Sequence, residues 1–396
     1  MFGMLSDSVR SDLFFREPES IGAECARELI AHQLGGTLYM RGTQLGLARA
    51  ISREGVRGTT CVVVCMEDAI GEQELGAAEA NFDEALSTLQ QWGSDDLPMI
   101  FARVREPGDV TRVCRGDSGR LISGFVLPKF SPMNADAWFT ATTEAASLRG
   151  RRLWVMPVLE SVELGDPGRR NEWLRDVKAV LGPEVNEILA VRVGATDIAG
   201  SLALRRSAGF TLYDVGPLRD ALGAIVGTFA SCPAAVPAIS GCAYEHFTPG
   251  SGSPELKLIG GGEHDVRLSS YTGTSYAGIQ TMAAELALDR VHGLVGKTAI
   301  HPSQVPLINA WQPVTHEEYV DAASVLTTSG ATISEYANKM NEAQPHQRWA
   351  QKTLLRARAS GVLAASVSWE DVYASTLVGT SHMASAIPSR AQGLMR

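Results

Sequence analysis

Charged side chains follow several apolar runs of the 396-residue chain, at the point where each run ends. The acidic members of this set are Glu67, Asp68, Glu160 and Asp197, and the basic members are Arg103, Arg105 and Lys129. Taken singly, such a residue is usually a helix N-cap or a solvated loop residue. Arg103 differs, because it lies within an apolar run where an unpaired guanidinium is costly. Collectively, acids and bases at the ends of successive runs indicate a functional site.

These residues converge only if the apolar runs are neighbouring parallel strands. Eight runs are predicted strands, at 13–15, 60–66, 99–104, 124–127, 153–159, 187–193, 235–240 and 294–300. Between them lie helix-like segments such as 72–92, 135–148, 171–181, 217–229 and 274–291. Eight such units favour an α/β fold of the closed (β/α)₈ TIM-barrel type, although periodicity alone does not exclude an open doubly wound sheet. In a barrel the charged residues meet at one mouth.

Two regions break this alternation. Residues 244–275 are rich in Gly, Ser and Pro and predict a long loop, either an active-site lid or a disordered insertion. Helices are predicted at 317–329 and 333–341, followed by a basic helix through Lys352, Arg356 and Arg358. We therefore expect a barrel over residues 8–312 and a C-terminal helical lid or oligomerisation extension over residues 313–396.

Composition narrows the class of protein. With 35 basic and 44 acidic side chains the net charge is −9, which argues against a nucleic-acid or anionic-membrane binder. No run of about 18 apolar residues is present, and the N-terminal residues lack the apolar block of a signal peptide. We expect a cytoplasmic enzyme. The six cysteines include no zinc-type pair, and Cys61 and Cys65 are predicted to be small buried hydrophobic residues.

Short motifs recur in a characteristic order along the chain. They are Val62-Val-Val-Cys-Met-Glu-Asp-Ala-Ile70, Ala102-Arg-Val-Arg105, Val126-Leu-Pro-Lys129, Val158-Leu-Glu-Ser161, Gly194-Ala-Thr-Asp197 and Gly296-Lys-Thr-Ala-Ile-His-Pro-Ser-Gln304. In this order they resemble the HpcH/HpaI aldolase and citrate lyase β-subunit family, as a divergent member. The segment 10–15 resembles the first strand of that family.

The resemblance implies a magnesium-dependent carbon–carbon lyase, or the reverse reaction, working through a metal-stabilised enolate. The substrate would be an oxo- or hydroxy-acid, free or as a CoA or phosphate derivative. Glu160 and Asp197 match the carboxylates that bind Mg²⁺ (or Mn²⁺). Arg103 matches the arginine that holds the substrate's oxygens and would stabilise the enolate. Glu67 and Asp68 match an acidic pair that orders the metal's waters and the neighbouring arginine, and either is a candidate for proton transfer.

Further residues carry predicted roles that the resemblance leaves more open. Lys129 is predicted to orient the substrate, with a Schiff base as the alternative. Gly194 and Ala195, in the motif that ends at Asp197, are predicted substrate contacts, as are Lys297 and His301 near the eighth strand, where barrels often bind phosphate. His301 is equally well explained as a structural histidine.

The chain also departs from the family pattern. Cys65 stands where an acid is usual, and Arg105 replaces an asparagine. Together with the insertion at 244–275, these changes indicate an altered substrate pocket, and Arg105 favours an anionic appendage on the substrate. One alternative is an enzyme of the same design that condenses two substrates instead of cleaving one. Another is a non-catalytic scaffold subunit of a biosynthetic complex, and the absence of an acid at Cys65 mildly favours this second alternative. The resemblance also implies a homo-oligomer.

Overall fold

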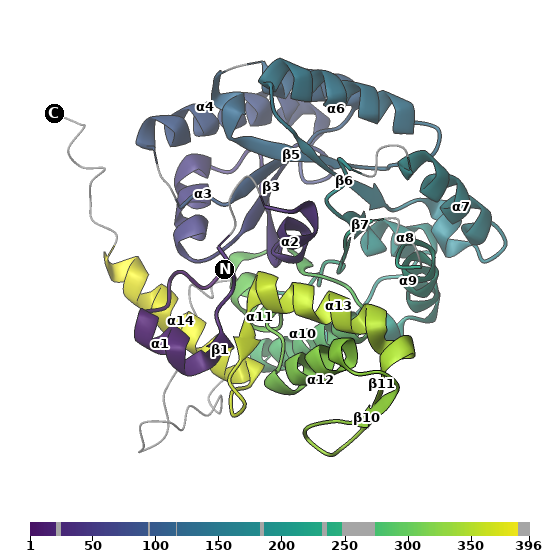
Figure 1. The fold of residues 1–396 in the computed structure, drawn as a ribbon. Helices are drawn as coiled ribbons and strands as arrows, with labels where there is room; N and C mark the ends of the chain where they lie inside the picture. The colour runs from purple at the N-terminus through teal and green to yellow at the C-terminus, as the bar shows by residue number, and fades with distance from the viewer. Residues whose placement is uncertain are drawn as a thin grey trace.

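A closed barrel of parallel strands forms the centre of the molecule (Figure 1). The computed structural model describes residues 1–20, 25–93, 96–115, 117–182, 186–231, 236–247 and 274–386. Eight strands make one sheet in the spatial order β8-β7-β6-β5-β4-β3-β2-β9. They are β2 (Gly36–Arg41), β3 (Cys61–Cys65), β4 (Met99–Arg103), β5 (Ile122–Leu127), β6 (Trp154–Leu159), β7 (Val191–Val193), β8 (Ile239–Ser240) and β9 (Lys297–Ala299). A parallel bridge between Gly241 and Lys297 joins the two ends of the sheet, so the predicted (β/α)₈ barrel is confirmed.

Helices cover the outside of this barrel. They are α3 (Leu47–Val56), α4 (Leu75–Trp92), α5 (Pro107–Cys114), α6 (Ala135–Arg149), α7 (Arg170–Leu181), α8 (Ala195–Ser201), α9 (Gly216–Phe229), α10 (Thr274–Val291) and α11 (Val305–Ala310). Alternate residues of each strand serve the two sides of the wall. In β3, Val62 and Val64 belong to the larger core cluster shared with the helices, whereas Cys61 and Val63 belong to a second cluster inside the barrel.

The helix ends follow from local sequence signals. Gly93 and Gly150 end α4 and α6 in the left-handed conformation, with φ of +60° and +62°. Glycine adopts this conformation without the steric penalty of a side chain. At the other end, Pro217 lies in the first turn of α9, where its missing N–H is not needed.

The prediction for the first barrel strand is wrong. Residues 14–16 form β1 (Phe14–Arg16) after the short helix α1 (Asp7–Leu13), but β1 pairs antiparallel with β12 (Val362–Leu363) outside the barrel. The first barrel strand is β2, which pairs with β3 and β9. Its sequence carries Thr37, Tyr39 and Arg41 at alternate positions, so it lacks the continuous apolar run that marks the other strands.

The C-terminal region contains three helices and a hairpin: α12 (His316–Thr327), β10 (Ala331–Ile333), β11 (Met340–Glu342), α13 (Ala343–Ser360) and α14 (Trp369–Ala386). The predicted helix at 333–341 is therefore wrong, because the two short strands flanking a turn pair with each other. The hairpin is attached to α12 by Lys339 and Asn341, which both contact the carboxylate of Asp321.

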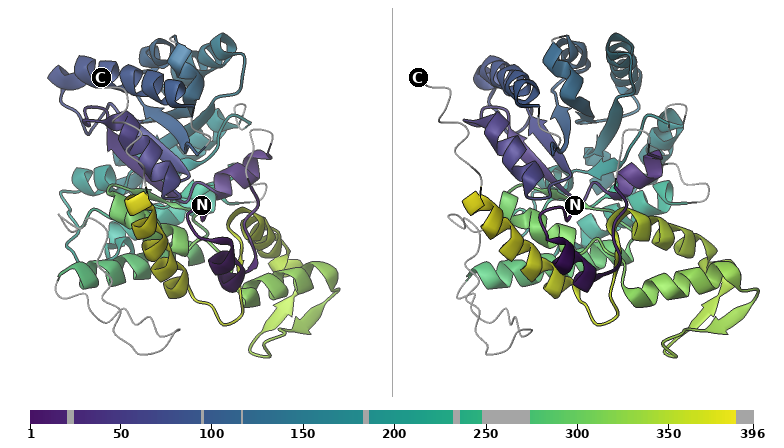
Figure 2. Two further views of the ribbon diagram at one scale, coloured as in Figure 1. Left: turned by 90° about the vertical axis from the view of Figure 1, so that its left-hand side faces the viewer. Right: turned by 60° about the vertical axis from the view of Figure 1, so that its left-hand side comes forward.

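The two ends of the chain pack together. Helix α13 contacts α2 (Arg27–His32), and α14 contacts α11. Helix α14 also contacts α1, and Figure 2 shows the two, in yellow and dark purple, side by side. The division of the chain at residue 312, and a lid or oligomerisation role for the C-terminal part, stay predictions. Most of the predicted insertion lies outside the described residues, because residues 248–273 are not among them.

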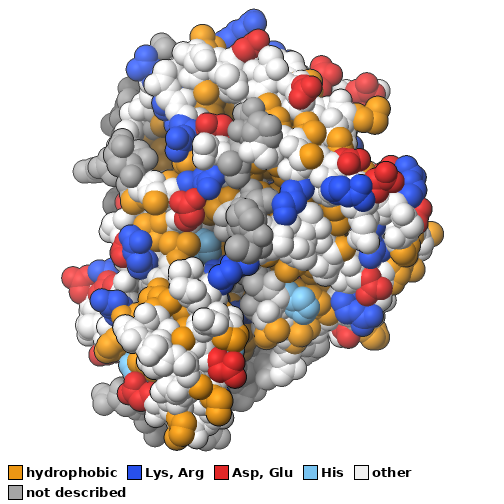
Figure 3. Space-filling model, turned by 45° about the vertical axis from the view of Figure 1, so that its right-hand side comes forward, with side chains coloured by type: hydrophobic (Ala, Val, Ile, Leu, Met, Phe, Trp, Pro, Cys, Tyr) orange, Lys and Arg blue, Asp and Glu red, His pale blue; other side chains and the backbone are white. Residues whose placement is uncertain are grey.

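The surface carries no concentrated field of one sign on the face drawn in Figure 3, where acidic and basic side chains alternate with apolar ones. Within the described part of the chain, none of the helices combines the length and the apolar character that a bilayer span requires.

Candidate active site at the C-terminal mouth of the barrel

Three carboxylates from distant parts of the sequence meet at the C-terminal ends of the strands. Asp68, Glu160 and Asp197 each offer one oxygen, and these three oxygens lie within 4.8 Å of one another. Asp68 follows β3, Glu160 follows β6 directly, and Asp197 lies in the first turn of α8, just after β7. Parallel strands bring these positions to the same rim, as the sequence predicted.

Arg103 ties this cluster together from the last position of β4. Its Nη2 lies 2.8 Å from Oε2 of Glu67, 2.9 Å from Oδ2 of Asp68 and 3.3 Å from Oε1 of Glu160. The Arg103 side chain is 10% exposed, so its guanidinium forms these charge-assisted bonds largely out of contact with water. The guanidinium is thereby held in one orientation beside three carboxylates.

Lys129 completes the cluster with both its side chain and its backbone. Its Nζ lies 2.7 Å from Oε1 of Glu67, and its backbone amide donates to Oε1 of Glu160 at 2.7 Å. The residue has a φ of +48°, a left-handed conformation that costs a residue with a side chain about 1 kcal/mol or more. This backbone conformation directs the amide toward Glu160.

The cluster carries an excess of negative charge. Four carboxylates face only two cationic side chains, Arg103 and Lys129. Burial raises the pKa of Glu160 to about 7, against the opposing charge of Arg103. Burial, and then the negative charge of Asp68, also raise the pKa of Asp197. Both pKa shifts show that the ionised carboxylates are not fully stabilised by the neighbouring cationic side chains. A hard divalent cation, which prefers oxygen ligands, would supply the missing positive charge. The residues present therefore fit a Mg²⁺ ion.

Gly194 lies against Glu160 so closely that no other residue fits without movement. A Cβ at Gly194 would come within 2.4 Å of Cβ and 2.5 Å of Oε2 of Glu160. Its amide donates to the carbonyl of Leu159 at 3.0 Å, which fixes the start of α8 relative to β6. Ala195 is buried at the first position of that helix. Both residues border the cluster, and their predicted contacts with substrate stay predictions.

Arg105 is held by the backbone of the loop that carries the acidic pair. Its Nε donates to the carbonyl of Met66 at 3.0 Å, and its Nη2 to the carbonyl of Ile70 at 2.6 Å. These bonds fix the segment that presents Glu67 and Asp68. A role for Arg105 in binding an anionic appendage stays a prediction.

Lys297 and His301 do not join the carboxylate cluster. The ammonium of Lys297 is fully buried on the helix side of β9, 2.7 Å from Oε1 of Glu285 and 2.7 Å from Oδ2 of Asp289 in α10. The ring of His301 stacks on Phe247 at 4.7 Å, and its Nδ1 lies 2.7 Å from Oγ of Ser303. Both side chains therefore have partners within the protein. Their predicted contacts with substrate stay predictions.

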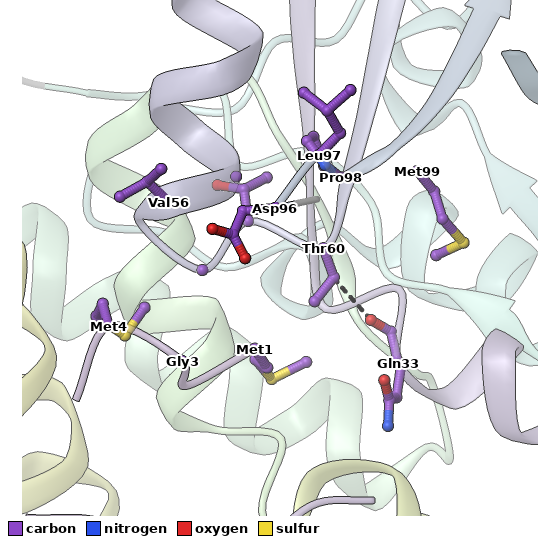
Figure 4. A pocket seen from close by; sticks show the side chains of 13 residues that line it. Met1, Gly3, Met4, Gln33, Val56, Thr60, Asp96, Leu97, Pro98 and Met99 are labelled. Carbon is purple, nitrogen blue, oxygen red and sulfur yellow. Dashed lines mark hydrogen bonds between the residues drawn. The ribbon is translucent and has the colours of Figure 1, made fainter. Parts of the chain in front are cut away.

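A pocket of about 360 Å³ lies at the opposite end of the barrel. Figure 4 shows Met1, Met4, Thr60 and Met99 around it, with the Thr60 hydroxyl donating to the carbonyl of Gln33 at 2.7 Å. Thr60 precedes β3 and Met99 begins β4, whereas Asp68 and Arg103 lie at the other ends of the same strands. None of the predicted site residues lines this pocket.

Sequence reasoning missed part of the site. It assigned Asp68 to the metal's waters, whereas the structure places an Asp68 oxygen among the three that converge. The sequence prediction also did not single out Arg192 in β7, which is a single buried arginine within an apolar run, as Arg103 is.

Comparison with known proteins agrees with this architecture. The model of a family described as carbon–carbon bond lyases of the TIM-barrel fold matches residues 28–362. The chain belongs to this family. The resemblance drawn from the order of the motifs is thereby confirmed, and the family match includes α12 and α13 of this lyase as well as the barrel.

The comparison with solved structures finds similarity at low sequence identity, and the first of the two structures below, with a TM-score of 0.59, shares the fold of this lyase. A citrate lyase from Burkholderia xenovorans LB400 is 16% identical with a TM-score of 0.59, covering 87% of this chain and 96% of its own. The protein CitE from Mycobacterium tuberculosis, in complex with magnesium, acetoacetate and coenzyme A, is 16% identical with a TM-score of 0.48, covering 83% and 99%. No curated protein matches the chain by sequence.

Proposed function

We propose that this lyase uses Mg²⁺, or Mn²⁺, to cleave or form a carbon–carbon bond in an oxo- or hydroxy-acid, as aldolases do. One observation carries the proposal: Asp68, Glu160 and Asp197 present three oxygens within 4.8 Å of one another at the mouth of the barrel. The excess negative charge of the cluster and membership of a carbon–carbon lyase family support the same function. The substrate acid would be free or carried as a CoA or phosphate derivative.

The chain's own residues supply orientation and positive charge. When bound, the metal ion would polarise a substrate oxygen. Arg103 is fixed by three carboxylates, and its Nε has no hydrogen-bond partner within the described residues. A fixed guanidinium favours the negative charge that develops on an oxygen when the carbon–carbon bond breaks. Lys129, whose side chain is 63% exposed, places a second positive charge at the solvent side of the cluster, where it can orient an anionic substrate.

Calorimetric titration with MgCl₂ tests the metal site. We expect Glu160→Gln and Asp197→Asn to weaken Mg²⁺ binding by about tenfold or more, since each loses a charged oxygen ligand. Asp136→Asn, an exposed residue in the first turn of α6, is the matched control and leaves binding unchanged. Magnesium affinity that stays at the wild-type value in both site variants would refute the assignment.

Turnover tests the reaction. Oxaloacetate, other 2-oxo acids, and malyl and citramalyl thioesters are incubated with the magnesium-loaded protein, and the cleavage products are measured. We expect one class to be cleaved, and Arg103→Lys to lower the rate because a lysine lacks the two-pronged donor geometry. Metal binding without any turnover of this panel would favour the scaffold alternative.

A further inference from the structure

A second buried arginine lies inside the barrel below the carboxylate cluster. Arg192 in β7 is 2% exposed. Its Nη2 donates to Oγ1 of Thr298 at 2.5 Å, its Nη1 lies 3.8 Å from Sδ of Met156, and its guanidinium carbon lies 5.4 Å from the centre of the Tyr39 ring. Its Nε is buried and has no hydrogen-bond partner among the residues that the structure describes. In the described part of the chain, no carboxylate contacts this guanidinium.

Among the described residues, three of the other four buried arginine and lysine side chains have carboxylate partners, and only Arg170 shares the lack of one with Arg192. Arg103, Arg206 and Lys297 each contact at least two carboxylates. Arg170, the remaining buried arginine among the described residues, lies in the helix layer and donates to the carbonyl of Leu164. A charge removed from water without a counter-ion costs several kcal/mol. Arg192 therefore lacks the compensating anion that its burial calls for.

Strand register places Arg192 one level below the metal-binding carboxylates. It pairs with Val158, which precedes Glu160 by two residues on the same face of β6. At about 3.3 Å per residue, the two levels are separated by about 7 Å along the strand. Tyr39 and Thr298, which contact Arg192, are both only partly buried, so solvent reaches side chains at this level.

We infer that the substrate carries a second anionic group, a carboxylate or a phosphate, and that Arg192 binds it at the floor of the active site. This inference rests on the proposed function, because it places the reacting end of the substrate at the carboxylate cluster. The guanidinium of Arg103 is already neutralised by three carboxylates, whereas within the described residues no carboxylate contacts the guanidinium of Arg192. A short acid with an anion at each end spans the depth between the two levels. Arg192 then acts as a specificity-determining residue.

Binding of three stable hydroxy-acids tests the inference by calorimetry in MgCl₂. Lactate has one carboxylate, malate adds a terminal carboxylate, and 3-phosphoglycerate adds a terminal phosphate. We expect the wild-type protein to bind malate or 3-phosphoglycerate more tightly than lactate, and the tighter ligand identifies the terminal group. Arg192→Met should weaken that ligand by about 30-fold or more and leave lactate unchanged. Arg170→Met, which removes a buried arginine outside the barrel interior, should leave the preference intact.

Two results would overturn the inference. One is a wild-type protein that binds lactate as tightly as both larger acids. The other is a variant Arg192→Met that retains the preference, or that weakens all three acids equally, as expected if Arg192 only offsets the negative charge of the cluster. If Arg192→Met does not fold by circular dichroism, Arg192→Lys decides, and its preference should fall by about tenfold, because the charge remains but the forked donor is lost.

The same titrations separate this inference from the proposed function. They are repeated in metal-free buffer, and MgCl₂ is titrated alone. Absence of magnesium binding in the wild-type protein would remove the proposed metal site. The preference for malate or 3-phosphoglycerate over lactate is measured as a ratio of affinities. Its dependence on Arg192 can therefore be tested whether or not the protein binds Mg²⁺.

Discussion

Replacing Gly194 by alanine is expected to disable the metal site while leaving the barrel folded. The added methyl carbon would lie 2.4 Å from Cβ and 2.5 Å from Oε2 of Glu160. Because carbon atoms normally approach no closer than about 3.5 Å, Glu160 or the start of α8 must move by about 1 Å. The backbone itself tolerates alanine, since φ at this position is −88°. The strain therefore falls on the contact with Glu160.

Glu160 has little freedom to move away without losing its partners. It accepts from the amide of Lys129 at 2.7 Å and contacts Arg103 at 3.3 Å. A displacement of about 1 Å breaks this geometry and separates the Glu160 oxygen from those of Asp68 and Asp197. We expect Mg²⁺ affinity to fall by about 10- to 100-fold, a loss typical of disturbed ligand orientation. Overpacking should cost about 1–3 kcal/mol of folding stability.

Calorimetry with MgCl₂ and urea unfolding measure the two effects separately. The matched control is Gly200→Ala in α8, where an added Cβ meets nothing within 4 Å. This control should bind Mg²⁺ as the wild type does and gain up to about 1 kcal/mol, because alanine is the better helix former. A folded Gly194→Ala protein with wild-type magnesium affinity would refute the geometry of the site.

Two further predictions concern residues outside the carboxylate cluster. Burial, with the nearby charges of Lys352 and Arg356, lowers the pKa of His32 to about 4, so protonation favours the unfolded chain below pH 6.5. Unfolding free energy should fall by about 3 kcal/mol between pH 6.5 and pH 4 through this group. The loss should be absent in His32→Gln, and parallel pH profiles of the two proteins would contradict it. Lys297→Met leaves Glu285 and Asp289 without their shared ammonium and should cost about 3–5 kcal/mol. The folded Lys297→Met protein should bind Mg²⁺ as the wild type does. If this variant instead keeps the wild-type stability and loses binding of the substrate acid, Lys297 contacts the substrate.

Much of the barrel was predictable because most of its strands are buried on both faces. Runs such as residues 61–65 are apolar at every position, since one side packs on helices and the other fills the barrel. Strand β2 escaped notice for the opposite reason. Its inward positions Thr37, Tyr39 and Arg41 all carry polar groups, and their alternation with Leu38 and Met40 resembles the pattern of a strand with one exposed face. The hairpin at 331–342 escaped notice because strands of three residues carry almost no periodic signal.

The convergence of the candidate site was predictable from strand ends alone, because every parallel strand delivers its C-terminal residue to the same rim. That rule brought together Glu67, Asp68, Arg103, Lys129, Glu160 and Asp197. It cannot tell which way a side chain points from within a strand. Neither can it detect that Gly194 must lack a side chain, which depends on the approach of two loops in space.

Strand β9 shows how this orientation decides which residue of a motif can reach a ligand. Lys297 and Thr298 are neighbours in the motif over residues 296–304, and the lysine is the more obvious ligand for an anion. Successive residues of a strand point to opposite faces, however, so only one of the two can face the barrel interior. Lys297 points to α10 and binds Glu285 and Asp289. Thr298 is the residue that contacts Arg192 inside the barrel. Positive charge inside the barrel near this strand is thus provided by Arg192, from the other side of β8, and this arginine, not Lys297, is the one that we propose to bind the second anionic group of the substrate.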